Sequence, residues 1–233
     1  ALAAGAAETP YGRGVLAASV NDFVDFSEPT LPGRLYVPPE AAADPNTPRP
    51  FILFLHGAGE TGNNNVAQIN GNIDNLLDGA KEHGAFLYAP QAVTRNWSDM
   101  NRTTTVMDKI DEALAMHNID PNRLYVTGLS MGGGGVWNMA NRFSDRFAAA
   151  VPIAGVNPSF DFNGSNFVEL HTWPFHARDD GVVPPTPSRD TINNILAAAG
   201  EATLTYPAPN DGFTTLLYNN SFRANLSAPL PAP

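Results

Sequence analysis

The sequence predicts an α/β fold in which helices cover both faces of a mostly parallel central sheet. Short apolar runs alternate with longer stretches of helical period, which is the pattern of successive strand–helix–strand units. Several of these runs are apolar almost throughout, as strands buried on both faces are. The length of 233 residues fits one large domain of this kind.

The individual elements follow from the same patterns. The apolar runs predict strands at 34–37, 51–55, 85–89, 123–127, 147–153, 173–177 and 202–206. Apolar positions three and four apart predict helices at 104–117, 131–143 and 187–199, and a less regular one at 66–83. The stretch 38–50 contains too many prolines for either element and is expected to be a surface loop.

A single domain is expected over 21–224, because neither an internal repeat nor a change of composition divides the chain. Residues 1–20 start with small side chains and no initiator Met, as the mature side of a signal cleavage site does. Residues 225–233 are typical of the start of a Pro-rich linker. We therefore expect a secreted protein with a further domain beyond this tail.

Composition and charge exclude several classes of partner and chemistry. The formal net charge is −10, and a surface this acidic repels nucleic acid and anionic membranes. No uninterrupted apolar stretch approaches the roughly 18 residues of a membrane span. The absence of cysteine rules out thiolate metal sites and a cysteine nucleophile. No cofactor is expected.

The segment Gly128-Leu129-Ser130-Met131-Gly132 lies between a predicted strand and a predicted helix. In this context Gly-x-Ser-x-Gly indicates a sharp turn that exposes a reactive serine hydroxyl at the edge of the sheet. The flanking glycines avoid collisions in that turn. The helix start adds a free N–H from Met131 that can bind an oxyanion. The alternative is a Gly-rich connection without chemistry.

Two further segments carry the other groups that a serine hydrolase needs. His56-Gly57-Ala58-Gly59-Glu60 follows the strand at 51–55, where a loop of small residues can point backbone N–H groups at an oxyanion. Asp179 and Asp180 follow the strand at 173–177, where the order Ser, Asp, His places the orienting carboxylate. Spacing alone does not separate the two aspartates, and a turn with solvated acids is the alternative.

These segments together resemble the α/β-hydrolase esterases grouped with polyhydroxybutyrate depolymerases and carbohydrate-esterase-like carboxylesterases. The resemblance is carried by IDPNRLYVTGLSMGGGGVWNMANRFSDRFAAAVPIAG, FILFLHGAGETG, FHARDDGVVP and YAPQAVTRNWSD, and it covers roughly residues 30 to 220. It implies an α/β-hydrolase fold and the cleavage of carboxylic esters, either small esters or a polyester such as polyhydroxyalkanoate.

The resemblance also implies roles for individual residues. Ser130 would be the nucleophile and Asp180 the acid, with Ala58 and Met131 as oxyanion donors. Trp97 would line the acyl or alcohol pocket. His56 would stand beside the substrate, where it braces the oxyanion loop.

The catalytic histidine of that family is missing from this sequence. It is expected in a turn about thirty residues after the acid, where this chain has Asn210 and Asp211, and no histidine follows His176. Asp is a weak base toward a serine hydroxyl at neutral pH, and Asn is none. Three explanations are open: natural loss of activity, a deliberate substitution, or a base from residues absent here.

Three functions compete at this point. The first is a secreted serine esterase that works through an acyl-enzyme at Ser130. The second is a catalytically impaired protein of the same fold, natural or engineered, that binds ester or polymer. The third is a metal-dependent hydrolase, whose ligands would be His171, His176, Asp179 and Asp180. That spacing is not a familiar ligand pattern, so no metal site is expected.

Overall fold

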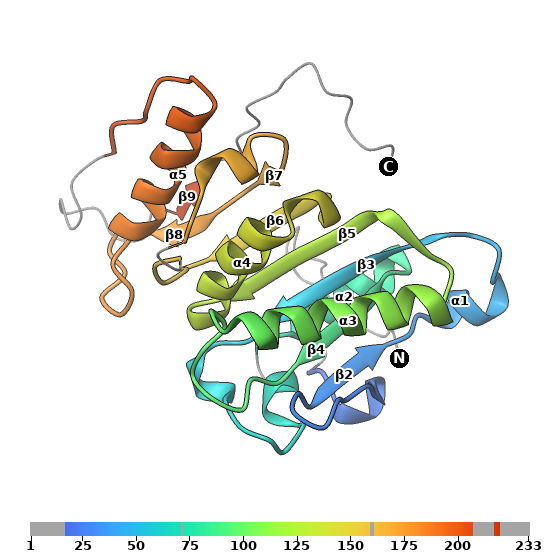
Figure 1. Ribbon diagram of the computed structural model, residues 1–233. Helices are drawn as coiled ribbons and strands as arrows, with labels where there is room; N and C mark the ends of the chain where they lie inside the picture. Colours follow the sequence, from blue (N-terminus) through green and yellow to red (C-terminus); the bar gives the residue numbers. More distant parts are fainter. Residues whose placement is uncertain (1–16, 71, 159–160, 207–216, 220–233) are drawn as a thin grey trace, which may run out of the picture.

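The computed structural model describes residues 17–70, 72–158, 161–206 and 217–219, and these residues form one mixed sheet with flanking helices (Figure 1). The strands are β1 (Val24–Asp25), β2 (Gly33–Tyr36), β3 (Arg49–Leu55), β4 (Phe86–Pro90), β5 (Ile119–Leu129), β6 (Ala149–Ile153), β7 (His171–Thr172), β8 (Phe175–Ala177) and β9 (Leu217–Asn219). The helices are α1 (Pro39–Ala43), α2 (Asp74–His83), α3 (Met100–Met116), α4 (Met131–Arg142) and α5 (Thr186–Ala198).

The described strands lie in the order β1-β2-β4-β3-β5-β6-β8-β9, and β7 pairs with β6. The central strands β4, β3, β5, β6 and β8 are parallel. The antiparallel pairs lie toward the two edges, where β1 and β2 precede β4, and β9 follows β8. The fold is therefore the mostly parallel α/β sheet that the sequence predicts, and the carboxyl ends of β3, β5 and β8 lie at one edge.

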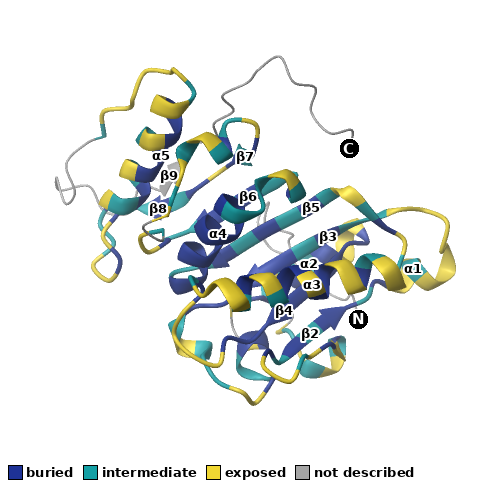
Figure 2. Cartoon of the chain, in the orientation of Figure 1, coloured by how far each residue is buried: buried dark blue, intermediate teal, exposed yellow. Residues whose placement is uncertain are grey.

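Helices cover both faces of the sheet, but unequally. Figure 1 shows α3 and α4 in front of the sheet and α2 behind it. On β5 the side chains of Leu124 and Val126 point to the α4 side and are buried. Those of Tyr125 and Thr127, on the other face, are partly exposed. Figure 2 shows the same contrast on α3, whose solvent side is exposed and whose inner side is buried.

Most of the predicted elements are confirmed within one to four residues at each end. Two predictions need correction. The stretch 38–50 contains the short helix α1 and the start of β3, because proline is tolerated at a first helical position and Pro39 occupies it. The helix predicted over 66–83 is shorter, since only 74–83 forms α2 and a single turn, Ala67–Ile69, precedes it.

The strand predicted at 202–206 is wrong. These residues have no regular secondary structure and are mostly exposed. The sheet edge beside β8 is taken instead by β9, which runs antiparallel and places Leu217 opposite Ala177. Leu204 is held by Asn193 of α5, whose side-chain amide accepts from its N–H (2.8 Å) and donates to its carbonyl (3.0 Å). A segment without a neighbouring strand lacks the ladder that defines one.

No described helix has the length and apolar character that crossing a membrane requires. The domain limits expected from the sequence, after residue 20 and before residue 225, stay predictions, because the chain before residue 17 and after residue 219 lies outside the described part.

Candidate active site

Ser130 lies at the junction between β5 and α4 in a conformation that few side chains adopt. Its φ is 59° and its ψ is −117°, a left-handed backbone that costs energy in any residue other than glycine. The surrounding structure holds it there, since its N–H donates to the carbonyl of Ile153 on β6 (2.8 Å). Its side chain does not cap α4 with a hydrogen bond. The turn therefore presents the Ser130 hydroxyl, as the motif predicts.

The glycines around Ser130 are required by close backbone contacts. A β-carbon on Gly132 would lie 1.9 Å from the carbonyl oxygen of Leu55, and one on Gly128 would lie 2.6 Å from the same oxygen. The start of α4 therefore packs directly on the end of β3. This packing brings the loop after β3 next to the serine.

The loop after β3 borders Ser130. A β-carbon on Gly57 would lie 3.5 Å from the carbonyl oxygen of Leu129 and 3.8 Å from the β-carbon of Ser130. Ala58 opens the short 3-10 helix Ala58–Glu60, and Met131 is the first residue of α4. In the described chain neither N–H donates a hydrogen bond. N–H groups without an acceptor among the described residues are what an oxyanion hole needs, and the assignment of Ala58 and Met131 as its donors stays a prediction.

His56 braces this loop and uses both ring nitrogens to do so. Its Nδ1 lies 2.6 Å from the carbonyl oxygen of Gly57, so Nδ1 carries the proton and donates it. Its Nε2 accepts from the N–H of Ala92 (2.9 Å). The ring is 1% exposed. His56 therefore ties the loop after β3 to the loop after β4 and has no nitrogen left for proton transfer.

Trp97 lies in the core rather than in an open pocket. Its side chain is 2% exposed, and its Nε1–H donates to the carbonyl of His56 (3.1 Å). The ring meets His56 edge-on, with centroids 5.2 Å apart, and packs against α4 where Gly135 leaves room for it. This placement supports a role in holding the loop of His56. Direct contact of Trp97 with a substrate stays a prediction.

We expect the free energy of unfolding to fall as the pH drops through about 6.5. Burial lowers the pKa of His56 below its ordinary value of 6.5, against the Gly57 hydrogen bond and the Glu60 carboxylate, which favour the charged ring. The unfolded chain therefore takes up the proton first. The stabilisation is complete above pH 6.5 and is lost below it.

Urea unfolding at about pH 8 and about pH 5.5 measures this loss. The difference between the free energies of unfolding at the two pH values should shrink in His56→Gln, because that variant lacks the buried imidazole whose pKa is lowered. His83→Gln is the matched control, since His83 is an exposed residue at the end of α2. A full pH difference in His56→Gln would show that another group is responsible.

Asp180 lies in the turn after β8 and is held as a carboxylate. Its Oδ1 accepts from the backbone N–H groups of Val182 and Val183, each at 2.9 Å. Burial alone would raise its pKa, but these two hydrogen bonds and the nearby His176 outweigh it and hold the pKa of Asp180 below its ordinary value. Oδ2 takes part in neither bond. The Asp180 carboxylate is thus held in a fixed orientation, and its role as the orienting acid stays a prediction.

The described histidines offer no base to Ser130. His83 ends α2 and His117 caps the end of α3, at the edge opposite to the site. His176 is buried on β8 with both ring nitrogens in hydrogen bonds. Positions 210 and 211, where the base was expected, lie outside the described residues. Within the described part, no three His, Asp or Glu side chains cluster as metal ligands.

Two residues of the site had no sequence argument behind them. Gln91 is fully buried, and its side-chain amide donates to the carbonyl of Glu60 (2.9 Å) and accepts from the N–H of Asn65 (2.7 Å). Ser188 on α5 bonds to His176 (2.8 Å). The Pro-Gln pair after a buried strand was a usable signal for Gln91. A serine inside a first helical turn was a weak one for Ser188.

Comparison with known proteins places this geometry among hydrolases. Residues 88–173 match the prolyl oligopeptidase family. A poly(3-hydroxybutyrate) depolymerase of Ralstonia pickettii is 31% identical over 144 residues, which is 55% of this chain and 30% of that protein. A thermostable esterase of known structure is 34% identical with a TM-score of 0.70, over 83% of this chain and 56% of its own. The chain therefore has an α/β-hydrolase fold and is similar to carboxylic ester hydrolases.

Two further comparisons agree with this similarity. A bifunctional acetylxylan esterase/xylanase of Neocallimastix patriciarum is 29% identical over 148 residues, 57% of this chain and 21% of that protein. An acetyl xylan esterase from Aspergillus awamori is 16% identical with a TM-score of 0.58, over 76% of this chain and 79% of its own, and shows the fold alone. The chain spans less than a third of the length of the curated relatives that it matches.

Proposed function

We propose that this chain cleaves carboxylic esters through an acyl-enzyme at Ser130. The observation that carries the proposal is the strained turn at Ser130, which stands beside two backbone N–H groups without hydrogen-bond acceptors. Strain of this kind is kept where a function uses it. The related depolymerase and esterase are named for the same reaction class.

The steps follow from the positions of these groups. The Ser130 hydroxyl attacks the ester carbonyl, and the N–H groups of Ala58 and Met131 stabilise the negative charge on its oxygen. The alcohol leaves, and water then releases the acid from the serine. Asp180 Oδ2 is the carboxylate oxygen left to orient a base. Because the chain has no histidine after His176, we propose that the base lies outside these 233 residues.

The substrate that fits best is a neutral ester, either a small one or a polyester such as polyhydroxyalkanoate. The acidic net charge of −10 disfavours anionic substrates, and the relatives are named as depolymerases and esterases. We also propose that the protein is secreted, with its low charged content of 15% as support. Recovery of the protein from the culture medium of its source tests this last point.

Mass spectrometry after incubation with p-nitrophenyl acetate tests the acyl-enzyme. We expect one acetyl group on the peptide that contains Ser130, and none in Ser130→Ala, because only the hydroxyl in the strained turn lies next to the oxyanion donors. Without a base within the chain, the acetyl group should persist after the substrate is removed, since deacylation also needs proton transfer. Equal labelling and equal hydrolysis in both proteins would reject the proposed function.

An impaired protein that only binds esters is the second candidate, and the missing histidine is the observation that favours it. It predicts saturable binding of an ester without acetylation of Ser130. The same experiment therefore separates the two candidates.

A further inference from the structure

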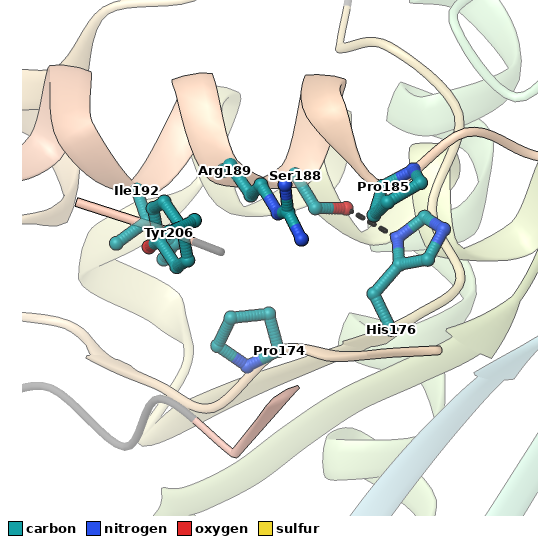
Figure 3. Close-up of a pocket in the computed structure, with 7 residues that line it drawn as sticks. All are labelled: Pro174, His176, Pro185, Ser188, Arg189, Ile192 and Tyr206. Carbon is teal, nitrogen blue, oxygen red and sulfur yellow. Dashed lines mark hydrogen bonds between the residues drawn. The ribbon is translucent and has the colours of Figure 1, made fainter. Parts of the chain in front are cut away.

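Ser188 occupies an unusual place at the start of α5. It is the third residue of α5, whose N-cap residue is Pro185 and has no side-chain hydrogen bond to the helix. The Ser188 side chain is buried, and its Oγ lies 2.8 Å from Nδ1 of His176 on β8. Figure 3 shows this hydrogen bond between the helix and the strand. The Ser188 hydroxyl thus forms a hydrogen bond with the imidazole of His176.

The protonation of His176 follows from its two partners. Its Nε2 lies 2.8 Å from the carbonyl oxygen of Val183, which can only accept, so Nε2 carries the proton. Nδ1 of the neutral ring is then an acceptor, and the Ser188 hydroxyl must be its donor. The Val183 carbonyl therefore fixes the tautomer in which Nε2 carries the proton, and Ser188 supplies the second hydrogen bond that holds the ring in place.

Val183 connects His176 to Asp180 through the two polar groups of its backbone. The carbonyl of Val183 accepts from His176, while the N–H of Val183 donates to Asp180 Oδ1 (2.9 Å). The second N–H on that oxygen comes from Val182, whose side chain is 90% exposed and has no packing to hold it. Asp180 Oδ2 lies 3.6 Å from His176 Nε2. The Val183 side chain is buried, so packing and hydrogen bonds together hold the two N–H groups that orient this carboxylate.

Ser188, His176 and Asp180 are not a second catalytic triad. The Nε2–H of His176 is given to Val183, so the carboxylate is not its acceptor as a triad requires. The cavity beside Ser188 and His176, which Pro174, Ile192 and Tyr206 also line (Figure 3), has a volume of about 10 Å³. That space holds about one water molecule and no ester. The arrangement can position a group but cannot bind a substrate.

We propose that Ser188 is a positioning residue for the Asp180 carboxylate and acts through His176. The proposal rests on the proposed function, in which Asp180 orients the base. Loss of the Ser188 hydroxyl leaves Nδ1 of the buried ring without its hydrogen bond and the ring with one anchor fewer, so the hydrogen bond from His176 to Val183 weakens and the Asp180 turn loosens.

The test is NMR on the full chain, with Ser188→Ala, Ser188→Thr and Thr191→Val. Thr191 is the matched control, because it is buried on the same helix and its hydroxyl donates to Pro187 instead (2.8 Å). In Ser188→Ala we expect the ¹⁵N shift of His176 Nδ1 to move to that of a ring nitrogen without a hydrogen bond, while Nε2 stays protonated. Amide exchange at Val182 and Val183 should become about tenfold faster, as expected for a lost hydrogen bond. Ser188→Thr should restore both, and Thr191→Val should leave both unchanged.

A single outcome would overturn the proposal: wild-type ¹⁵N shifts and wild-type exchange in Ser188→Ala. If that variant does not fold, Ser188→Cys gives the same readings with a weak donor of similar size. Neither reading depends on turnover, so failure of the proposed function would show instead as an unlabelled Ser130. Where the acyl-enzyme forms, its rate in Ser188→Ala should fall about tenfold with unchanged ester affinity.

Discussion

Gly132→Ala is expected to prevent the chain from reaching its native fold. The new β-carbon would lie 1.9 Å from the carbonyl oxygen and 2.5 Å from the carbonyl carbon of Leu55, and 2.7 Å from the carbonyl oxygen of His56. These are backbone atoms, so no rotamer change relieves the contact. Shifting β3 would break its pairing with β5 at Gly128, and shifting α4 would displace Ser130.

The loss of stability should exceed about 4 kcal/mol, which is a large part of the roughly 5–15 kcal/mol that holds a typical domain together. Urea unfolding followed by circular dichroism measures it. Gly79→Ala is the matched control, because Gly79 lies inside α2 and a β-carbon there has nothing within 4 Å. That variant should be more stable by about 0.5–1 kcal/mol. A Gly132→Ala protein within 1 kcal/mol of wild type would refute the close packing.

In a protein that includes the proposed base, Asp180→Asn is expected to slow ester turnover by about three to four orders of magnitude, as for the corresponding change in a serine triad. An amide can still accept from Val182 and Val183, so the turn should keep its shape. The negative charge that favours a protonated base is lost, however. The loss should fall on kcat and leave KM nearly unchanged, because Asp180 is not expected to contact the ester.

Asp179→Asn is the matched control for this prediction, since it removes the same charge one residue earlier. Steady-state kinetics on both variants should show a much smaller change for Asp179→Asn, because only Asp180 is proposed to orient the base. Equal losses of turnover in the two variants would mean that the negative charge of the turn as a whole matters, rather than one oriented carboxylate. A loss in Asp179→Asn alone would assign the acid to the other aspartate.

The sequence by itself determined the layout of strands and helices and the place of the nucleophile. Periodicity decides which segments are strands or helices, and steric limits at Ser130 leave little choice for its flanking glycines. The preference for Asp180 over Asp179 came from the family resemblance, and only the structure shows the two N–H groups that single it out. The absence of the expected catalytic histidine is also read from the sequence, because no histidine follows His176.

The tertiary structure alone decided which segments find neighbours and which side chains are buried. The run 202–206 looks like a strand, but β9 occupies the edge beside β8, and a strand exists only through its pairing. Only the structure shows that Trp97 packs against Gly135 and donates to the carbonyl of His56. Ser188 and His176 are twelve residues apart in the chain, and only the packing of α5 on β8 joins them. Local periodicity does not encode such contacts, because they depend on how distant segments meet.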